Sequence, residues 1–132
     1  MNEIALNQIG TLYHKLGEDA IQNLVNRFYD IMDSEPNAAG IRAMHENLDT
    51  SREKLFTFLI GRFGGPPLYV EKYGHPMLRA KHAPFSIGTA ERDQWLSCMQ
   101  KAMDDCIGDM ELIPVMKDFF IMVADSMRNK TE

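Results

Sequence analysis

The sequence predicts an all-α fold, and three observations support this. Apolar residues recur at helical spacing along nearly the whole chain. Convincing period-two alternation and a strand–helix–strand order are both missing from the sequence. Hydrophobic residues make up 45% of the 132 residues, which is enough for a core. The length fits one domain, over residues 1–132.

Two helices are expected over about residues 4–16 and 19–34, separated by Gly17. The apolar positions of the first are Ile4, Leu6, Ile9, Leu12 and Leu16. Those of the second are Ile21, Leu24, Val25, Phe28 and Met32, with Tyr29 beside them. Pro36 follows the second helix, where helices tend to stop. Residues 38–48 are expected to form a short helical turn and a corner.

The next helix is predicted from Thr50 to about residue 63. Thr50 and Glu53 have the spacing of a capping box, in which each side chain bonds the backbone of the other residue. Four residues form its expected inward face, widened by Phe56 and Ile60: Leu55, Phe58, Leu59 and Phe63. The "GGPP" of residues 64–67 ends it, with Gly64 in the left-handed conformation.

Residues 68–88 are expected to be irregular around one short helix near 76–83. Long loops are uncommon unless they are functional or disordered, and the aromatic residues here argue against disorder. Thr89 is then expected to cap a helix to about Ile107, with a last helix from Glu111. Their inward faces are predicted to hold Trp95, Met99, Ala102, Met103 and Cys106, and then Ile113, Met116, Phe120, Val123 and Met127.

Composition excludes several classes of protein. The net charge is −5 without a basic stripe, which argues against nucleic-acid binding. No apolar run approaches the roughly 20 residues of a membrane span. Residues 1–10 lack the features of a signal peptide, so we expect a cytoplasmic protein. Cys98 and Cys106 would lie about 12 Å apart along one helix, so buried reduced thiols are expected.

His82 is the best candidate ligand for a cofactor. Sequence motifs for phosphate binding and for a nucleophilic serine are missing, whereas His82 lies in the irregular segment. An iron porphyrin needs a neutral imidazole on one face and cations near its propionates. Lys81, Arg79 and Lys54 are candidates for those cations. The alternative is that His82 is a hydrogen-bonded loop residue.

Three further side chains are candidates for contact with a bound ligand. For Tyr29 and Trp95 the alternative is that each is a core residue whose polar atom has a partner within the protein. His45 lies in the corner before residue 50, where surface exposure is the alternative.

Taken together, these segments resemble a known family. "RFYDIM", "SREKLFTFLIGRFGGPPLY", "GHPMLRAKHAPFSIG" and "ERDQWLSCM" are similar, in order and spacing, to motifs of the bacterial group II truncated hemoglobins. The resemblance implies a two-over-two helical sandwich around heme b. It implies that His82 is the proximal iron ligand, and that Tyr29 and Trp95 face the distal pocket. It also implies that Leu55 and Phe58 form the distal wall and that Phe85 is a further cofactor contact. Lys81 stands where family members often carry arginine.

The resemblance leaves the corner open. His45 matches the position of an aromatic residue against the heme, although a shift by one residue would place Met44 there. On the distal side His45 would hydrogen-bond the ligand or coordinate iron itself.

The implied function is binding or transport of O₂ and other diatomic ligands, NO and CO, at a pentacoordinate or loosely hexacoordinate iron. Hydrogen bonds from Tyr29 and Trp95, with His45 as a third donor, would make O₂ release slow. An enzyme for nitric oxide dioxygenation or peroxide detoxification is the alternative, and it would need an external reductase. A helical interaction module without cofactor is a third class. The chain is expected to be a monomer or a homodimer.

Overall fold

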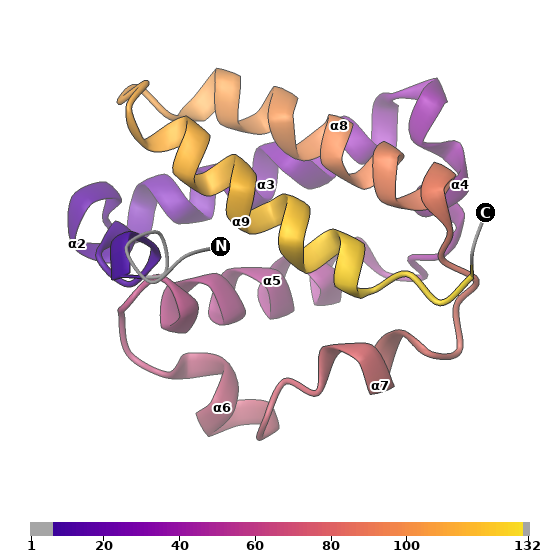
Figure 1. Ribbon diagram of the computed structural model, residues 1–132, viewed down its shortest axis with the longest axis horizontal. Helices are drawn as coiled ribbons and strands as arrows, with labels where there is room; N and C mark the ends of the chain where they lie inside the picture. The colour runs from indigo at the N-terminus through magenta and orange to yellow at the C-terminus, as the bar shows by residue number, and fades with distance from the viewer. Residues whose placement is uncertain (1–6, 131–132) are drawn as a thin grey trace.

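The computed structural model describes residues 7–130, and the regular structure in that range is helical (Figure 1). The elements are α2 (Leu12–Leu16), α3 (Glu18–Ser34), the 3-10 turn η1 (Pro36–Ala38), α4 (Ala39–Ala43), α5 (Leu48–Arg62), α6 (Leu68–Tyr73), α7 (Leu78–His82), α8 (Thr89–Cys106) and α9 (Leu112–Ser126). The predicted all-α class is confirmed. Ile4 and Leu6, which belong to the first predicted helix, lie outside the described residues.

The four long helices form two packed pairs. α3 contacts both α5 and α8, and α8 contacts α9. Figure 1 shows α9 crossing in front of α3, with α5 below it and α8 above it. This is the predicted two-over-two sandwich. The short helices α6 and α7 lie on the far side of α5 from α9, and α7 leads into α8.

The core is built from the predicted apolar stripes. Seven residues of α3 are buried: Ile21, Leu24, Val25, Phe28, Tyr29, Ile31 and Met32. Met99, Ala102 and Met103 of α8, and Met116, Phe119 and Phe120 of α9, are buried with them. Each large side chain removed from water contributes about 1.5–3 kcal/mol to folding. The cysteines are free, with Cys98 buried and Cys106 half-buried.

A close backbone approach explains the glycine after α5. Gly64 has a φ of 98°, in the left-handed region that was predicted for it. A Cβ at Gly64 would lie 2.0 Å from the carbonyl oxygen of Gly10. The Tyr13 N–H donates to the Phe63 carbonyl at 2.8 Å, which ties α2 to the end of α5.

The predicted caps are wrong at two helix starts. Asn47, not Thr50, caps α5, and its Oδ1 accepts from the N–H groups of Asp49 and Thr50 at 2.9 and 3.2 Å. α5 therefore begins two residues earlier than predicted, and Glu53 is free to bond elsewhere. Gly88 takes the N-cap position of α8, and its N–H donates to the Glu91 carboxylate at 2.7 Å.

Two predicted segments also differ from the structure. The first helix is interrupted, since residues 7–9 are helical and a turn at residues 10–11 separates them from α2. Residues 68–88 contain two short helices where one was predicted. α7 lies within the predicted 76–83, whereas α6 was not expected. Among the described helices, none is both long enough and apolar enough to cross a membrane.

Candidate functional site

The His82 side chain ends α7 and is oriented by its own helix. Its Nδ1 lies 2.7 Å from the carbonyl oxygen of Leu78, one turn earlier. A carbonyl only accepts, so Nδ1 carries the proton and Nε2 is left with a free lone pair. A histidine that ligates a metal is commonly held in this way, because the hydrogen bond fixes the ring and raises the basicity of the ligating nitrogen. His82 therefore presents Nε2 as a metal ligand.

The segment around His82 is held by a residue from the end of the chain. The Asn129 side-chain amide donates to the Phe85 carbonyl at 2.6 Å and to the His82 carbonyl at 3.4 Å. Its Oδ1 accepts from the Ile87 N–H at 2.8 Å, and its own N–H donates to the Ile87 carbonyl at 2.9 Å. Asn129 thus pins the backbone on the C-terminal side of His82. Sequence analysis missed it, because a single polar residue near the C-terminus gives no pattern.

Tyr29 and Trp95 come from α3 and α8 and meet at one aromatic ring. The Phe28 ring lies 4.8 Å from the Tyr29 ring and 4.9 Å from the Trp95 ring, measured between centroids. Tyr29 is buried and Trp95 is half-buried. The packing of α3 against α8 therefore brings together two side chains that are 66 positions apart in the sequence.

Neither of these two side chains makes a hydrogen bond with its polar group within the described part of the chain. Over residues 7–130 the Tyr29 hydroxyl and the Trp95 indole N–H have no hydrogen-bond partner, although Tyr29 is only 5% exposed. Burial raises the pKa of the Tyr29 phenol, so the hydroxyl stays protonated and can donate. Neither polar atom belongs to the fully buried, unpartnered atoms of the described residues, so both donors are accessible to a ligand that supplies an acceptor.

His45 lies next to Tyr29, and its ring has the same arrangement as His82. The two rings of His45 and Tyr29 are 5.9 Å apart and edge-on, which favours His45 over Met44 as the corner residue of the site. Its Nδ1 lies 2.8 Å from the Ile41 carbonyl, again one turn earlier. The pKa of His45 is lowered, mainly by burial and further by the charges of Arg42 and His82. The neutral ring therefore offers a bare Nε2, which accepts a hydrogen bond or coordinates a metal but does not donate.

The three apolar candidates are partly exposed side chains. Leu55 and Phe58 of α5 are only half-buried, although they pack against the core, and Phe85 is 40% exposed. Phe58 contacts Tyr69, a buried tyrosine of α6 whose role sequence analysis did not predict, at 6.1 Å between ring centroids. Apolar side chains that are left partly exposed can contact a flat apolar cofactor.

The three candidate cations are exposed, with Lys54 on α5 and Arg79 and Lys81 on α7. Lys81 donates to the Tyr69 hydroxyl at 2.7 Å. The Lys54 ammonium lies 5.5 Å from the centre of the Tyr73 ring, and Arg79 is exposed on α7. All three have long side chains that can reach acidic groups at the edge of a cofactor.

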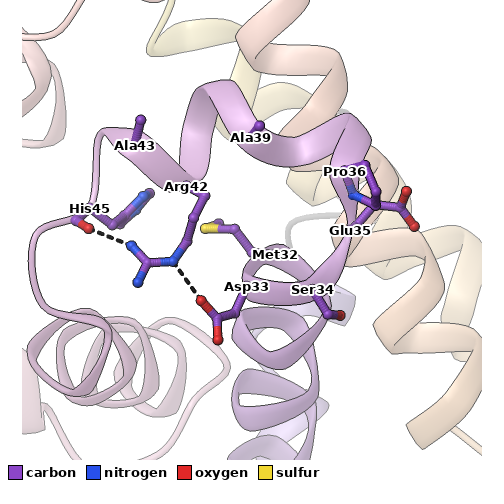
Figure 2. A pocket seen from close by; sticks show the side chains of 9 residues that line it. All are labelled: Met32, Asp33, Ser34, Glu35, Pro36, Ala39, Arg42, Ala43 and His45. Atoms are coloured by element: carbon purple, nitrogen blue, oxygen red, sulfur yellow. Dashed lines mark hydrogen bonds and ion pairs between the residues drawn. The ribbon is translucent and has the colours of Figure 1, made fainter.

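A separate pocket of about 350 Å³ lies behind the corner (Figure 2). It is lined by the end of α3, η1 and α4, and His45 is the one site residue among its walls. Arg42 crosses it, bonding Asp33 at 2.8 Å and the His45 carbonyl at 2.7 Å. This ion pair helps to hold the corner that carries His45, and neither Tyr29 nor His82 lines the pocket.

These residues fit a heme. A proximal nitrogen with a free lone pair, two donors without a protein acceptor and partly open apolar walls match what an iron porphyrin requires of its protein. A site made of several protein ligands to a bare metal is not supported, since no group of three or more His, Cys, Asp or Glu residues in the described range could hold a metal ion.

Comparison with known proteins agrees with this assignment. Residues 11–129 match the family model of the bacterial-like globins. A group 2 truncated hemoglobin of Bacillus subtilis, YjbI, is 39% identical over 91% of this chain and 89% of its own length.

Two solved structures are similar over most of both chains. The group II 2-on-2 hemoglobin of Agrobacterium tumefaciens is 44% identical, with a TM-score of 0.87, over 90% of this chain and 94% of that one. A truncated oxygen-avid haemoglobin from Bacillus subtilis is 38% identical, with a TM-score of 0.81, over 89% and 98%. The chain therefore belongs to the bacterial-like globins and, among them, to the group II truncated hemoglobins, which implies a heme protein that binds gaseous ligands.

Proposed function

We propose that this protein binds O₂, and also NO and CO, at the iron of a heme b held by His82, and that it releases O₂ slowly. The observation that carries this proposal is the pair of donors without a protein acceptor, Tyr29 and Trp95, which both pack against the Phe28 ring. The similar haemoglobin of Bacillus subtilis is described as oxygen-avid, which agrees with it. Cys98 and Cys106 both lie on α8 rather than next to His82, which supports a heme held without thioether bonds.

Heme iron would give a bound diatomic ligand partial negative charge, and hydrogen-bond donors such as Tyr29 and Trp95 would stabilise that charge. Each hydrogen bond to a charged acceptor is worth about 1.5–3 kcal/mol. Since about 1.4 kcal/mol corresponds to a tenfold change in an equilibrium constant, two such bonds would slow O₂ release by orders of magnitude. Lys54, Arg79 and Lys81 are proposed to hold the propionates, while Leu55, Phe58 and Phe85 contact the porphyrin.

His45 has a different role in this proposal from that of the two donors. Its bare Nε2 can accept a hydrogen bond from the Tyr29 hydroxyl or from bound water, and it can coordinate iron when no ligand is present. The iron would then be loosely six-coordinate before O₂ binds. The expectation that His45 is a third donor is therefore replaced, for the neutral ring, by the role of acceptor or weak ligand.

The test is the rate of O₂ dissociation from the ferrous protein. Tyr29→Phe and Trp95→Phe should each speed dissociation about 10- to 100-fold, the effect of losing one charged hydrogen bond. Tyr13→Phe, on α2, is the matched control and should leave the rate unchanged. His45→Ala should change the ligand-free spectrum more than the dissociation rate. If neither Tyr29→Phe nor Trp95→Phe changes the rate, the donor scheme is wrong.

A second candidate function is the reduction of hydroperoxides with electrons from an external donor. One observation favours it: the Tyr73 hydroxyl donates to the Glu53 carboxylate at 2.5 Å, in contact with the aromatic residues that lead to the heme space. This pair has no role in reversible O₂ binding.

A further inference from the structure

The four tyrosines of this chain have different hydrogen-bond partners. Tyr73 donates to the Glu53 carboxylate, whereas the Tyr69 oxygen accepts from the Lys81 ammonium. The hydroxyls of Tyr13 and Tyr29 have no hydrogen-bond partner within residues 7–130. Of the four, Tyr73 alone has a base placed to take its phenolic proton.

Tyr73 is also connected to the heme space by a short series of rings. The Phe58 ring is 6.1 Å from the Tyr69 ring, and the Tyr69 ring is 4.9 Å from the Tyr73 ring. Tyr69 is 6% exposed, while Tyr73 is half-exposed. The series therefore runs from the wall of the site, through a buried ring, to a ring that solvent can reach. Lys81, which contacts Tyr69, is next to His82 in the sequence.

We propose that Tyr73 is a site of reversible one-electron oxidation that supplies electrons to the heme during hydroperoxide reduction, with Tyr69 as the intermediate ring and Glu53 as the proton acceptor. The inference rests on the proposed heme site and on the second candidate function. It adds a surface site at which an external phenolic reductant would deliver its electrons.

The reaction balances with one hydroperoxide and two phenols. The O–O bond breaks, and two electrons and two protons convert the hydroperoxide to an alcohol and water. Tyr73 supplies one electron while its O–H proton moves to Glu53, which leaves a neutral tyrosyl radical. A phenolic reductant at the surface then returns a hydrogen atom to Tyr73, and Glu53 is deprotonated again by solvent. Two such cycles reduce one hydroperoxide, and two reductant molecules are oxidised to phenoxyl radicals.

The charges around Tyr73 favour loss of the proton together with the electron. The ammonium groups of Lys54 and Lys72 lie 5.5 and 5.4 Å from the centre of the Tyr73 ring. Nearby cations destabilise a cationic radical but have little effect on a neutral one. Lys72 also bonds the second oxygen of Glu53, which fixes the carboxylate in place. Tyr69 has an ammonium where Tyr73 has a carboxylate, so an oxidised Tyr69 ring is the higher-energy, short-lived state, and the oxidation comes to rest on Tyr73, which can give its proton to Glu53.

The experiment mixes the ferric, heme-loaded protein with an equimolar amount of hydrogen peroxide and freezes it for electron paramagnetic resonance. The wild type should give a tyrosyl signal that Tyr73→Phe removes and Glu53→Gln strongly reduces. Tyr13→Phe, the matched control, should keep it. Oxidation of an added phenol should slow in Tyr73→Phe, while the first reaction of the heme with peroxide, followed in its optical spectrum, stays unchanged.

Two results would overturn the inference while leaving the heme site and its reactivity intact. One is a reaction of the heme with peroxide that gives no tyrosyl signal in the wild type. The other is a signal that persists in Tyr73→Phe, or that is assigned to Trp95 or Tyr29. An optical spectrum that peroxide does not change would instead remove the second candidate function and this inference with it, and the proposed O₂ binding would stand.

Discussion

The helical scaffold and the proximal segment of this protein are held by different forces. α3 buries seven residues in contact with α5 and α8, whereas α7, which carries His82, has no buried residue. The segment from residue 74 to residue 86 has no buried residue and is held by polar contacts, from Leu78 to His82, from Lys81 to Tyr69 and from Asn129 to Phe85. One half of the heme site is therefore rigid before heme binds, and the other half is only lightly fixed.

This difference indicates which part of the protein gains most stability when heme binds. Ordering a residue of backbone costs roughly 1–2 kcal/mol, and a net hydrogen bond returns about 0.5–1.5 kcal/mol. Contacts of that size barely offset the cost of ordering α7. The iron–histidine bond and contacts with the porphyrin face are therefore expected to supply the remaining free energy that holds α7 in place. The donors on α3 and α8 are already placed by the core and need no such help.

The largest predicted effects separate the two regions by substitution. Leu24→Ala removes a fully buried side chain of α3 and should cost about 2–5 kcal/mol of unfolding free energy in the heme-free protein. His82→Gly should change that free energy by less than about 1 kcal/mol, as surface substitutions commonly do, yet abolish stable heme binding. Urea unfolding of the heme-free variants and heme titration followed in the optical spectrum measure the two quantities.

Two results would contradict the proposed difference between the helical scaffold and the proximal segment. If His82→Gly destabilises the heme-free protein as much as Leu24→Ala does, α7 is part of the scaffold after all. If His82→Gly retains heme with an unchanged coordination state and without added imidazole, the iron is not held through His82 and the proposed site is wrong.

The sequence predicted the scaffold well because burial imposes a helical period. The stripe on α3 and the glycine after α5 follow from the chemistry of single residues, and each was found where predicted. The prediction failed where two chemically similar residues compete. Asn47 and Thr50 can both cap a helix, and only the path of the chain through the corner selects Asn47.

The sequence nominates the residues of the candidate site one by one, but it does not predict the hydrogen bonds among them. The predicted side chains come from four helices and two connecting segments, so their contacts depend on packing that no linear pattern records. The roles of Asn129 and of the Tyr73–Glu53 pair arise from residues 20 or more positions apart. The tautomer of His45 is set by the Ile41 carbonyl, and this bond changes its expected role from donor to acceptor.

The second prediction weakens the proximal segment without touching iron. Asn129→Ala removes the side-chain bonds to the Phe85 carbonyl and the Ile87 N–H. Two bonds of about 0.7 kcal/mol each correspond to roughly a tenfold faster loss of heme, measured by transfer to an excess of apomyoglobin. The iron–histidine vibration should broaden as well, because the ring of His82 is held less firmly. Asn129→Asp keeps the acceptor oxygen, so its rate of heme loss should lie between those of the wild type and Asn129→Ala.

That prediction fails if Asn129→Ala loses heme at the wild-type rate. Equal effects of Asn129→Ala and Asn129→Asp would assign the whole contribution to the amide donor and its bond to the Phe85 carbonyl. A drop in the stability of the heme-free variant similar to that of Leu24→Ala would instead place the C-terminal segment in the scaffold.

The smallest predicted effect concerns His45, which joins the two regions at the corner. Its pKa in the folded protein lies below the ordinary value of 6.5, mainly because it is partly buried. The unfolded chain therefore takes up the proton first as the pH falls through about 6.5, and folding stability declines until the folded pKa is reached. His45→Gln should flatten this part of the stability curve of the heme-free protein, with His14→Gln, an exposed residue of α2, as the control. A wild-type curve with the same slope as that of His45→Gln between pH 7 and pH 5 would show that His45 titrates alike in both states, and the argument for its neutral, non-donating form would then fail.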